Sequence, residues 1–575
     1  MPPDAYAAYE ITVKQTLALL RGEFPSFLAA INRGMYAFWL GSGISREKLD
    51  AVPVFVLTVL KHLQSRGDPS DLNDPCWDPF KEALALAALS KAEKEEIDFS
   101  RDIDLWSVRD AIISRVSSRY SDLLDIHIEG EPPDYLLWDV LKVPQSYGAG
   151  VADPDLEHYC LAVLMMEGVA PEIVTANWDG LIEMAVEELA PGNESVVSVY
   201  VRAADFRQPR GRSRLLKFHG CAVRAIRDPT EYRGLLVGRR TQITDWPHDP
   251  EHAAMRQEMT TLGTSHPTLM IGLSAQDSNI QDLFSAAKNV LDWNWPIDPS
   301  AFVFAEEELG TYQKNILRVG YGASFHGSET FIAQASHVRA FAKPLLSALM
   351  IDTWSMKLEK LALLTRTGVD SSSASKVSAG IATLSSAAAS SVDTNMVAST
   401  RRLISDIGRA IALTRSGTNP SVPGSYMPIG AVPVHQMGDD PSLAESGFPE
   451  VAMALSIIGN NLAEGSMSLA STYEAQNALR PVLTTESGGI SSRVFFAANS
   501  RAAVELALNG FVDEGDPSAV VVHSVAPPHR VQRAPSSSLG RTGQRRARHI
   551  DMSELLLACS SYDELQQGFR EEFAL

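Results

Sequence analysis

The chain has 575 residues, of which 45% are hydrophobic and 21% are charged, and its formal net charge at pH 7 is −20. The length is enough for about two to four domains, and the acidic balance argues against a general nucleic-acid coat or an anionic-membrane binder. The N-terminus has no basic stretch before an apolar run, and no apolar run approaches about 18 residues, so we expect a cytoplasmic protein without a membrane span.

In chain order, residues 5–33 have apolar residues at helical spacing, which predicts a helix. Residues 35–40 form a short apolar run that ends in Gly41-Ser42-Gly43, a pattern typical of a buried parallel strand entering a strand-to-helix turn. Similar runs, each followed by small or polar residues, lie at 172–175, 215–218, 268–271 and 301–304. Helical patterns separate several of them, which predicts the α/β class with a Rossmann-like doubly wound parallel sheet over roughly residues 30–340.

The sheet is interrupted at about residues 75–165 by mixed helical patterns, which we interpret as a helical insertion. Its aromatic residues are interpreted as core side chains rather than a binding platform; they are Trp106, Tyr120, Tyr135 and Trp138. The insertion is assigned to one catalytic domain over residues 1–345.

The apolar patterns in the remaining chain predict a mainly helical or α+β C-terminal region. Residues 346–420 are interpreted as a helical linker region, and Ser- and Ala-rich residues 370–400 suit either a linker or a small-residue helix surface. Residues 421–575 are interpreted as an assembly or partner-binding domain. Its predicted elements are a helix near 450–480, a strand at 493–496, a helix at 499–510, a strand at 519–522 and a final helix at 552–573.

The four cysteines are scattered and form no CxxC pair; they are Cys76, Cys160, Cys221 and Cys559. A structural zinc site of the usual kind needs closely spaced ligand pairs, so we expect no metal site.

The first motif with chemical potential is Gly41-Ser42-Gly43-Ile44-Ser45. Glycines at a strand-to-helix turn let backbone N–H groups approach phosphate oxygens, and the helix N-terminus favours an anion. The alternative is a tight turn that needs glycine for its own geometry.

Three further motifs follow predicted strands. In residues 175–179, Asn177 and Asp179 can project from one loop, although Asn is also a common turn residue and Asp a common N-cap. His219, freed by a following glycine, suits a general base or a structural histidine. Residues 272–277 suit either a phosphate or ribose contact or a turn leading into a helix. Because ligands bind beyond the carboxyl ends of strands in such sheets, all these residues are expected near one site.

Together and in this order, the motifs resemble those of the sirtuin family. That family carries Gly-Ala-Gly-Ile-Ser, Thr-Gln-Asn-Ile-Asp, His-Gly and Gly-Thr-Ser after successive strands. The resemblance covers roughly residues 30–340 and implies that NAD is bound as a substrate and cleaved at its nicotinamide–ribose bond.

The resemblance also implies a role for each matching residue. Asn177 would position the nicotinamide ribose and the attacking water, and His219 would act as general base on a ribose hydroxyl. The pyrophosphate would be lined by Gly41, Ser42, Gly43 and Ser45. The nicotinamide carboxamide would be held by Asp179. The adenosine side would be contacted by Gly272 and Ser274, with Asp277 in the same loop.

The sequence departs from protein-deacylating sirtuins in two places. It lacks their four-cysteine zinc module, and residues 46–53 replace their Gly-Ile-Pro-Asp-Phe-Arg segment. With the long added regions, these departures resemble sirtuin-like effectors of bacterial antiphage systems, which hydrolyse NAD to nicotinamide and ADP-ribose. The resemblance implies an oligomer, or a complex with a neighbouring gene's product such as a HerA-like ATPase, a short Argonaute or a nucleotide-processing enzyme.

Three alternatives stay open from the sequence. The same bond cleavage can serve an NAD-dependent protein deacylase or an ADP-ribosyltransferase, a cyclic product can replace ADP-ribose, and a Rossmann-like fold can be a non-catalytic nucleotide-binding scaffold.

A basic segment near the C-terminus reverses the local charge of this acidic chain. It contains Arg530, Arg533, Arg541, Arg545, Arg546 and Arg548. The segment suits contact with nucleic acid or an acidic partner, and its Pro and Ser content favours a solvated loop instead.

Overall fold

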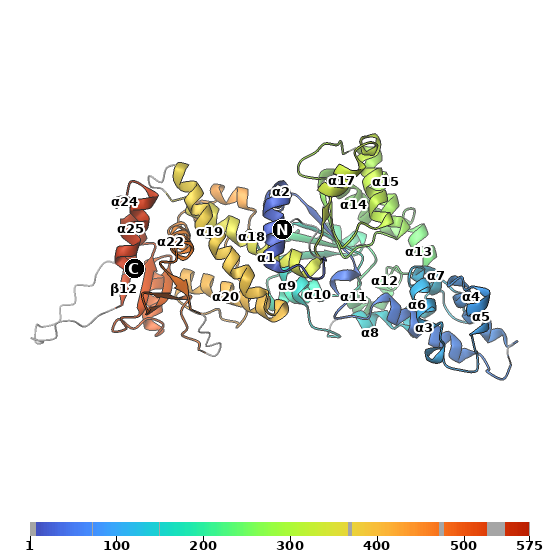
Figure 1. Ribbon diagram of the computed structural model, residues 1–575. Coiled ribbons are helices and arrows are strands. Elements are labelled where there is room, and N and C mark those ends of the chain that lie inside the picture. Colours follow the sequence, from blue (N-terminus) through green and yellow to red (C-terminus); the bar gives the residue numbers. More distant parts are fainter. Residues whose placement is uncertain are drawn as a thin grey trace, which may run out of the picture.

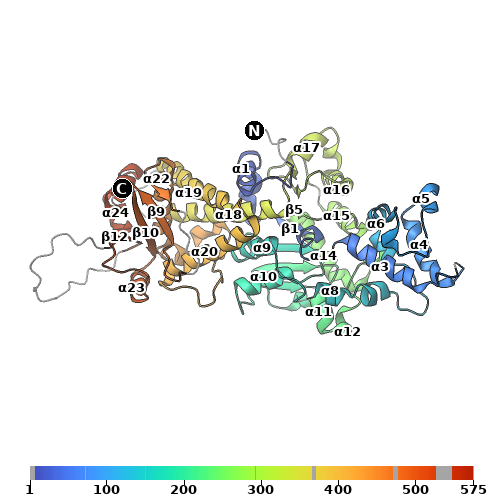
Figure 2. The same ribbon diagram turned by 60° about the horizontal axis from the view of Figure 1, so that its bottom comes forward.

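The structure is a computed structural model that describes residues 7–71, 73–148, 150–291, 293–365, 371–470, 477–525 and 547–573. A parallel sheet lies in the middle of the molecule, with a helical insertion on one side and the C-terminal region on the other (Figures 1 and 2). None of the helices in those ranges is long and apolar enough to cross a membrane.

The central sheet has seven strands in the order β3-β4-β2-β1-β5-β6-β7, and every neighbouring pair is parallel. The strands are β1 (Ala37–Leu40), β2 (Glu172–Thr175), β3 (Val197–Tyr200), β4 (Ser213–Lys217), β5 (Thr268–Ile271), β6 (Phe302–Ala305) and β7 (His337–Val338). The predicted doubly wound sheet is confirmed. The sequence did not predict two of its strands, because β3 is a half-buried edge strand and β7 has only two residues.

Strand β1 is the switch point of the sheet: the chain adds strands first on the side of β2 and then on the side of β5. All four residues of β1 are buried, and they alternate between two hydrophobic cores: Phe38 and Leu40 face one, and Trp39 faces the other. In open α/β sheets, ligands bind beyond the carboxyl ends of the strands at such a switch point.

Helices cover both faces of the sheet. The first face is covered by α1 (Val13–Glu23), α2 (Pro25–Asn32), α9 (Leu156–Met166), α10 (Leu181–Leu189) and α18 (Ala342–Ala362). The second is covered by α14 (Ala253–Ser265), α15 (Ser278–Val290), α16 (Thr311–Tyr321) and α17 (Glu329–Ala335). Shorter helices lie between β4 and α14: α11 (Ala222–Arg227), α12 (Pro229–Tyr232) and α13 (Arg240–Asp245). The helix predicted over 5–33 is two helices, because Pro25 lacks a backbone N–H and starts α2.

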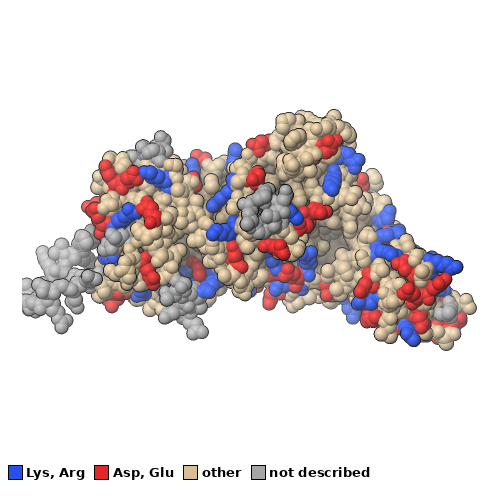
Figure 3. Space-filling model, viewed as in Figure 1, with Lys and Arg blue, Asp and Glu red and all other residues tan. Residues whose placement is uncertain are grey.

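The insertion has a hydrophobic core of its own. Its helices are α3 (Val52–Arg66), α4 (Asp78–Leu86), α5 (Lys91–Glu95), α6 (Arg109–Ser117), α7 (Tyr120–Leu124) and α8 (Val143–Tyr147). This core begins at Phe55, earlier than the predicted residue 75, and α9 belongs to the sheet layer rather than to the insertion. Acidic and basic side chains are interspersed over the insertion (Figure 3), as in the ion pairs of Asp104 with Lys61 and Arg109.

Most of the described residues between 346 and 420 are helical, and buried side chains of these helices belong to the main hydrophobic core. After α18 come α19 (Ser371–Val392) and α20 (Met396–Ser416), and α19 crosses α22 (Phe448–Ala463) closely. A Cβ atom added to Gly459 would lie 2.0 Å from the carbonyl oxygen of Gly380. The small residues of α19 therefore form a tightly packed helix surface.

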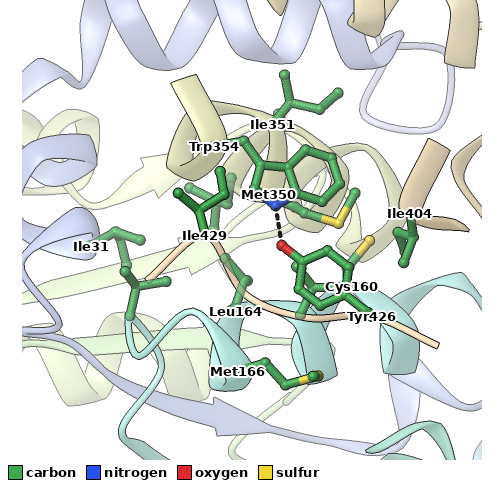
Figure 4. Packing of buried hydrophobic residues seen from close by; sticks show 14 of the residues in the cluster. Ile31, Cys160, Leu164, Met166, Met350, Ile351, Trp354, Ile404, Tyr426 and Ile429 are labelled. Atoms are coloured by element: carbon green, nitrogen blue, oxygen red, sulfur yellow. Dashed lines mark hydrogen bonds between the residues drawn. The ribbon is translucent and has the colours of Figure 1, made fainter. Parts of the chain in front are cut away.

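Buried polar side chains join the sheet layer to the C-terminal region. Tyr426 accepts a hydrogen bond of 2.7 Å from Trp354 Nε1 (Figure 4) and donates one to Glu167 at the end of α9. The fully buried ammonium of Lys357 lies 2.6 Å from the Glu167 carboxylate. The two regions are therefore joined by buried hydrogen bonds and by an ion pair in which each charge has its partner.

A second, mixed sheet has five strands in the order β12-β11-β10-β9-β8. They are β8 (Ser468–Leu469), β9 (Leu483–Ser487), β10 (Ile490–Ala497), β11 (Ala519–His523) and β12 (Arg548–Asp551). Strands β10 and β11 are parallel and α23 (Ser500–Leu508) connects them, which confirms the predicted strand–helix–strand unit. A short helix α21 (Pro441–Ala444) precedes α22.

Two predicted C-terminal helices have different bounds. The helix predicted near 450–480 ends at Ala463, and the helix predicted over 552–573 is divided into α24 (Met552–Ala558) and α25 (Tyr562–Phe573). In the basic segment, Arg548 donates to Ser492 Oγ at 2.8 Å, whereas Arg530, Arg533, Arg541, Arg545 and Arg546 lie outside the described residues.

Candidate functional site

A cavity of about 610 Å³ lies at the carboxyl edge of the central sheet. Its lining includes every residue that the sequence singled out for a site. These are Gly41, Ser42, Gly43, Ser45, Asn177, Asp179, His219, Gly272, Ser274 and Asp277. The volume is within the range of small-molecule sites.

The glycines allow two loops at the cavity to approach each other. A Cβ atom added to Gly41 would lie 2.3 Å from the carbonyl oxygen of Gly272, and one added to Gly43 would lie 2.6 Å from the Cα atom of Gly272. Gly272 has a φ of +60°, which L side chains rarely adopt. The N–H of Gly43 donates to the Gly272 carbonyl at 3.1 Å, so this amide is paired within the protein.

Ser45 is the centre of a hydrogen-bonded group that we call the Ser45 cluster, formed by Ser45, His158, Asn177 and Asp179. The Ser45 hydroxyl donates to Asp179 Oδ2 at 3.1 Å. It lies 3.1 Å from His158 Nε2 and accepts a hydrogen bond of 3.4 Å from Asn177 Nδ2. Asp179 also accepts from the backbone N–H of Leu181 at 3.1 Å, and its side chain is buried.

The cluster fixes how the Asn177 amide is oriented. A serine hydroxyl has one proton and can accept two hydrogen bonds, and Ser45 uses all three. Asn177 therefore turns its Nδ2 toward Ser45, and its Oδ1 is buried without a hydrogen-bond partner. Because a buried acceptor without a partner is costly and Asn177 lines the cavity, this oxygen is a candidate to accept a hydrogen bond from a ligand.

A second group, which we call the α15 cluster, consists of Asp277 and Asn279 at the N-terminus of α15 with their partners Tyr120 and His219. The Nδ2 atom of Asn279 lies 2.9 Å from His219 Nε2. Burial lowers the pKa of His219 from 6.5 to about 3, so the ring is neutral near pH 7. The Oδ1 of Asn279 is buried and unpartnered.

The insertion reaches the same cluster. Tyr120 in α7 donates a hydrogen bond of 3.1 Å to Asp277 Oδ1, and both residues line the cavity. Burial raises the pKa of Asp277 from 3.8 to about 6. The interpretation of the insertion's aromatics as core side chains is correct for buried Trp106, and Tyr135 and Trp138 pack against that core. It is incomplete for Tyr120, whose hydroxyl lies at the site.

The cavity extends along the first face of the sheet to Glu157, in the first turn of α9. Its Oε2 is buried without a hydrogen-bond partner, and burial raises its pKa to about 8. Lys343 nearby is paired with Asp155 at 3.0 Å and with Glu47 at 2.5 Å.

Sequence reasoning missed several polar residues at or behind the cavity: Tyr120, Glu157, His158 and Asn279. His158 stands three residues after the N-cap Asp155, which is a local helix-start signal rather than a site motif. Asn279 follows Asp277 by two residues and carries no separate signal. In the described ranges, no group of three or more His, Cys, Asp or Glu side chains is arranged to hold a metal ion.

A doubly wound parallel sheet with a glycine-lined cavity at its switch point defines a Rossmann-like protein of the nucleotide-binding type. A family model described as the SIR2-like domain matches residues 171–324. The chain therefore contains a sirtuin-like domain, and the resemblance inferred from the motifs is confirmed at this level. The match includes Asn177, Asp179, His219 and the 272–277 loop, while the 41–45 loop lies before it. Among curated proteins, no match to the chain is found.

Proposed function

We propose that this chain is an NAD glycohydrolase that cleaves the nicotinamide–ribose bond and releases nicotinamide and ADP-ribose. The observation that carries this proposal is the convergence of the four ordered motifs on one cavity at the switch point of a sirtuin-like domain. Sirtuin-like domains use NAD, so the family match supports an NAD-related activity in general.

In this proposal the glycine loops 41–43 and 272–274 receive the pyrophosphate and the adenosine side of NAD. For Ser45 we propose a different role from the one that the resemblance implies. Its hydroxyl is buried and makes three hydrogen bonds within the protein, so it holds Asn177 and Asp179 rather than a phosphate. Asp179 then orients the nicotinamide ring.

The unpartnered oxygen of Asn177 acts at the reacting ribose. Loss of nicotinamide builds positive charge on the ribose, and an amide oxygen stabilises that charge and orients a water molecule. The water oxygen forms the new bond to the ribose carbon as the bond to the nicotinamide nitrogen breaks with its electron pair. Nicotinamide leaves as a neutral molecule, and the water gives up one proton.

His219 is neutral, as an acceptor of a ribose or water proton must be. A ring has one free nitrogen in this state, and the amide of Asn279 determines which one it is. In the structure Asn279 Nδ2 faces Nε2, so Nε2 accepts and Nδ1 carries the ring proton. If the amide of Asn279 turns so that its oxygen accepts the Nε2 proton, Nδ1 is left unprotonated and free to act as the base. We propose this turned orientation of Asn279 for the reacting state.

The reaction is tested in water enriched in ¹⁸O, with nicotinamide and ADP-ribose separated by liquid chromatography and mass spectrometry. The proposal predicts nicotinamide release without any acyl-peptide and one ¹⁸O atom in the ADP-ribose. Strict dependence on an acyl-lysine peptide would favour a deacylase, transfer to a protein side chain an ADP-ribosyltransferase, and an unlabelled cyclic product a cyclase.

We further propose that NAD depletion by this chain serves antiphage defence, together with further copies or with a neighbouring gene's product. The C-terminal region is proposed to form that assembly. The test compares cellular NAD during phage infection in cells carrying the wild-type chain and Asn177→Ala. Loss of NAD and protection by the wild-type chain alone support the role, and equal protection by both chains contradicts it.

A further inference from the structure

His158 is a buried histidine that lies behind the cavity rather than in its lining. It belongs to α9 and follows the N-cap Asp155. The backbone N–H of Asp155 donates to His158 Nδ1 at 3.0 Å, and His158 Nε2 lies 3.1 Å from Ser45 Oγ. The ring therefore connects the start of a helix to the centre of the Ser45 cluster.

The hydrogen bonds fix the protonation of this ring. Nδ1 accepts the Asp155 N–H, so it carries no proton, and burial lowers the pKa of His158, so the ring is neutral. The single ring proton is on Nε2, which donates to Ser45. One of the two acceptor positions of the serine oxygen is thereby occupied by a donor that cannot reverse its direction.

The direction of this hydrogen bond determines how the Asn177 amide is oriented. With one acceptor position of Ser45 filled by His158, the serine proton is directed to Asp179, and the remaining acceptor position takes the Nδ2–H of Asn177. We propose that His158 is a positioning residue for the proposed NAD cleavage, because it keeps Nδ2 of Asn177 on Ser45 and so leaves Oδ1 as the amide atom without a protein partner. The effect of His158 on catalysis rests on the proposed function, whereas its effect on the orientation of Asn177 does not.

Two variants separate the donor role of His158 from its helix-capping role. In His158→Gln, an amide at the same place accepts the Asp155 N–H and still donates to Ser45. In His158→Glu, a carboxylate also accepts the Asp155 N–H, as Glu commonly does three residues after an N-cap, but presents an acceptor to Ser45. The Ser45 proton is then drawn away from Asp179 toward the new carboxylate, and Asn177 loses its fixed orientation.

The closing experiment measures kcat and KM for NAD, with a crystal structure of each variant. We expect His158→Gln to retain kcat within about threefold and His158→Glu to lose about tenfold or more in kcat with KM little changed. In the Ser45→Ala background, the change from His158→Gln to His158→Glu is expected to alter kcat by less than about twofold, because the connection is already broken.

The outcomes distinguish this inference from the proposed function. Equal kcat for the Gln and Glu variants in an active protein overturns the inference alone, and so does an equal loss in the Ser45→Ala background. If the wild-type chain does not cleave NAD, the proposed function fails, and the crystal structures still decide the inference: it requires Asn177 to keep its orientation in the Gln variant and to turn in the Glu variant. If the Glu variant does not fold, Ser45→Ala tests the same orientation of Asn177.

Discussion

The two sides of the cavity differ in how fully their polar groups are paired. In the Ser45 cluster, Ser45, Asp179 and His158 are connected by hydrogen bonds, and the unpartnered atom is Asn177 Oδ1. In the α15 cluster, Asn279 Oδ1 is unpartnered as well, and His219 and Asp277 each have one side-chain hydrogen bond and a pKa shifted by burial. The first side is suited to hold one oxygen in place, and the second to respond to protons and to ligand charge.

The largest effect is expected for the oxygen that the Ser45 cluster holds. Asn177→Ala should lower kcat by about a thousandfold, because the group that stabilises the charged ribose is removed. NAD affinity, measured by calorimetry, should change little. Asn315→Ala on α16, a half-buried asparagine outside the cavity lining, is the matched control and should retain activity. Retained turnover in Asn177→Ala would contradict the proposed role of this oxygen and with it the functional difference between the two sides of the cavity.

His219 comes next, and its removal tests the proton-accepting side. His219→Ala should lower kcat by about a hundredfold, as expected for loss of a general base. His252→Gln is the control, because His252 is also buried and stacks on Trp246 but does not line the cavity. Equal losses in the two variants would indicate that His219 has only a structural role.

A smaller effect concerns the glycine contact between the β1 and β5 loops. Gly43→Ala should lower the free energy of unfolding by about 1–3 kcal/mol, because its Cβ atom would meet the Gly272 backbone. Gly22→Ala is the matched control: apart from the adjoining residues and the backbone of its own helix, no atom lies within 4 Å of the added Cβ, and alanine favours the helix. Urea unfolding of both variants measures the difference, and unchanged stability in Gly43→Ala would show that the loops can separate without cost.

The smallest effect is a pH dependence of stability at Asp277. Because burial raises the pKa of Asp277 to about 6, the folded chain binds more protons than the unfolded chain between about pH 4 and 6. Its contribution to stability therefore falls as pH rises through this window. Asp277→Asn cannot ionise and still accepts the Tyr120 hydrogen bond. The free energy of unfolding of Asp277→Asn, relative to that of the wild type, should therefore be about 1 kcal/mol higher at pH 8 than at pH 5. Urea unfolding at the two pH values measures this difference. A gain independent of pH would contradict the raised pKa.

Much of the fold could be predicted from the sequence because central parallel strands are short, continuously apolar and followed by glycine or polar residues. The bounds of β2 and β5 agree with those predictions. Edge strand β3 could not be found this way, since only one of its four residues is buried. The separation of α1 from α2 depends on Pro25, and the packing of α19 depends on Gly459, 79 positions after Gly380 in the chain.

The site was predictable to the extent that its residues stand at strand ends. The residues singled out at those ends line one cavity, although their chemical roles stay proposals. The partners were not predictable, because they come from other elements: His158 from a helix start, Asn279 from the turn after Asp277, and Tyr120 from the insertion. Contacts between residues far apart in the chain, such as that of Ser45 with His158, leave no pattern in a local sequence window.

The most direct test of the central claim is the mass balance of NAD incubated with the purified chain, alone and with the product of the neighbouring gene. The account predicts that nicotinamide and ADP-ribose appear in amounts equal to the NAD lost. Recovery of all the NAD intact under both conditions, from a protein that demonstrably binds it, would contradict the account and identify the cavity as a nucleotide-binding site without turnover.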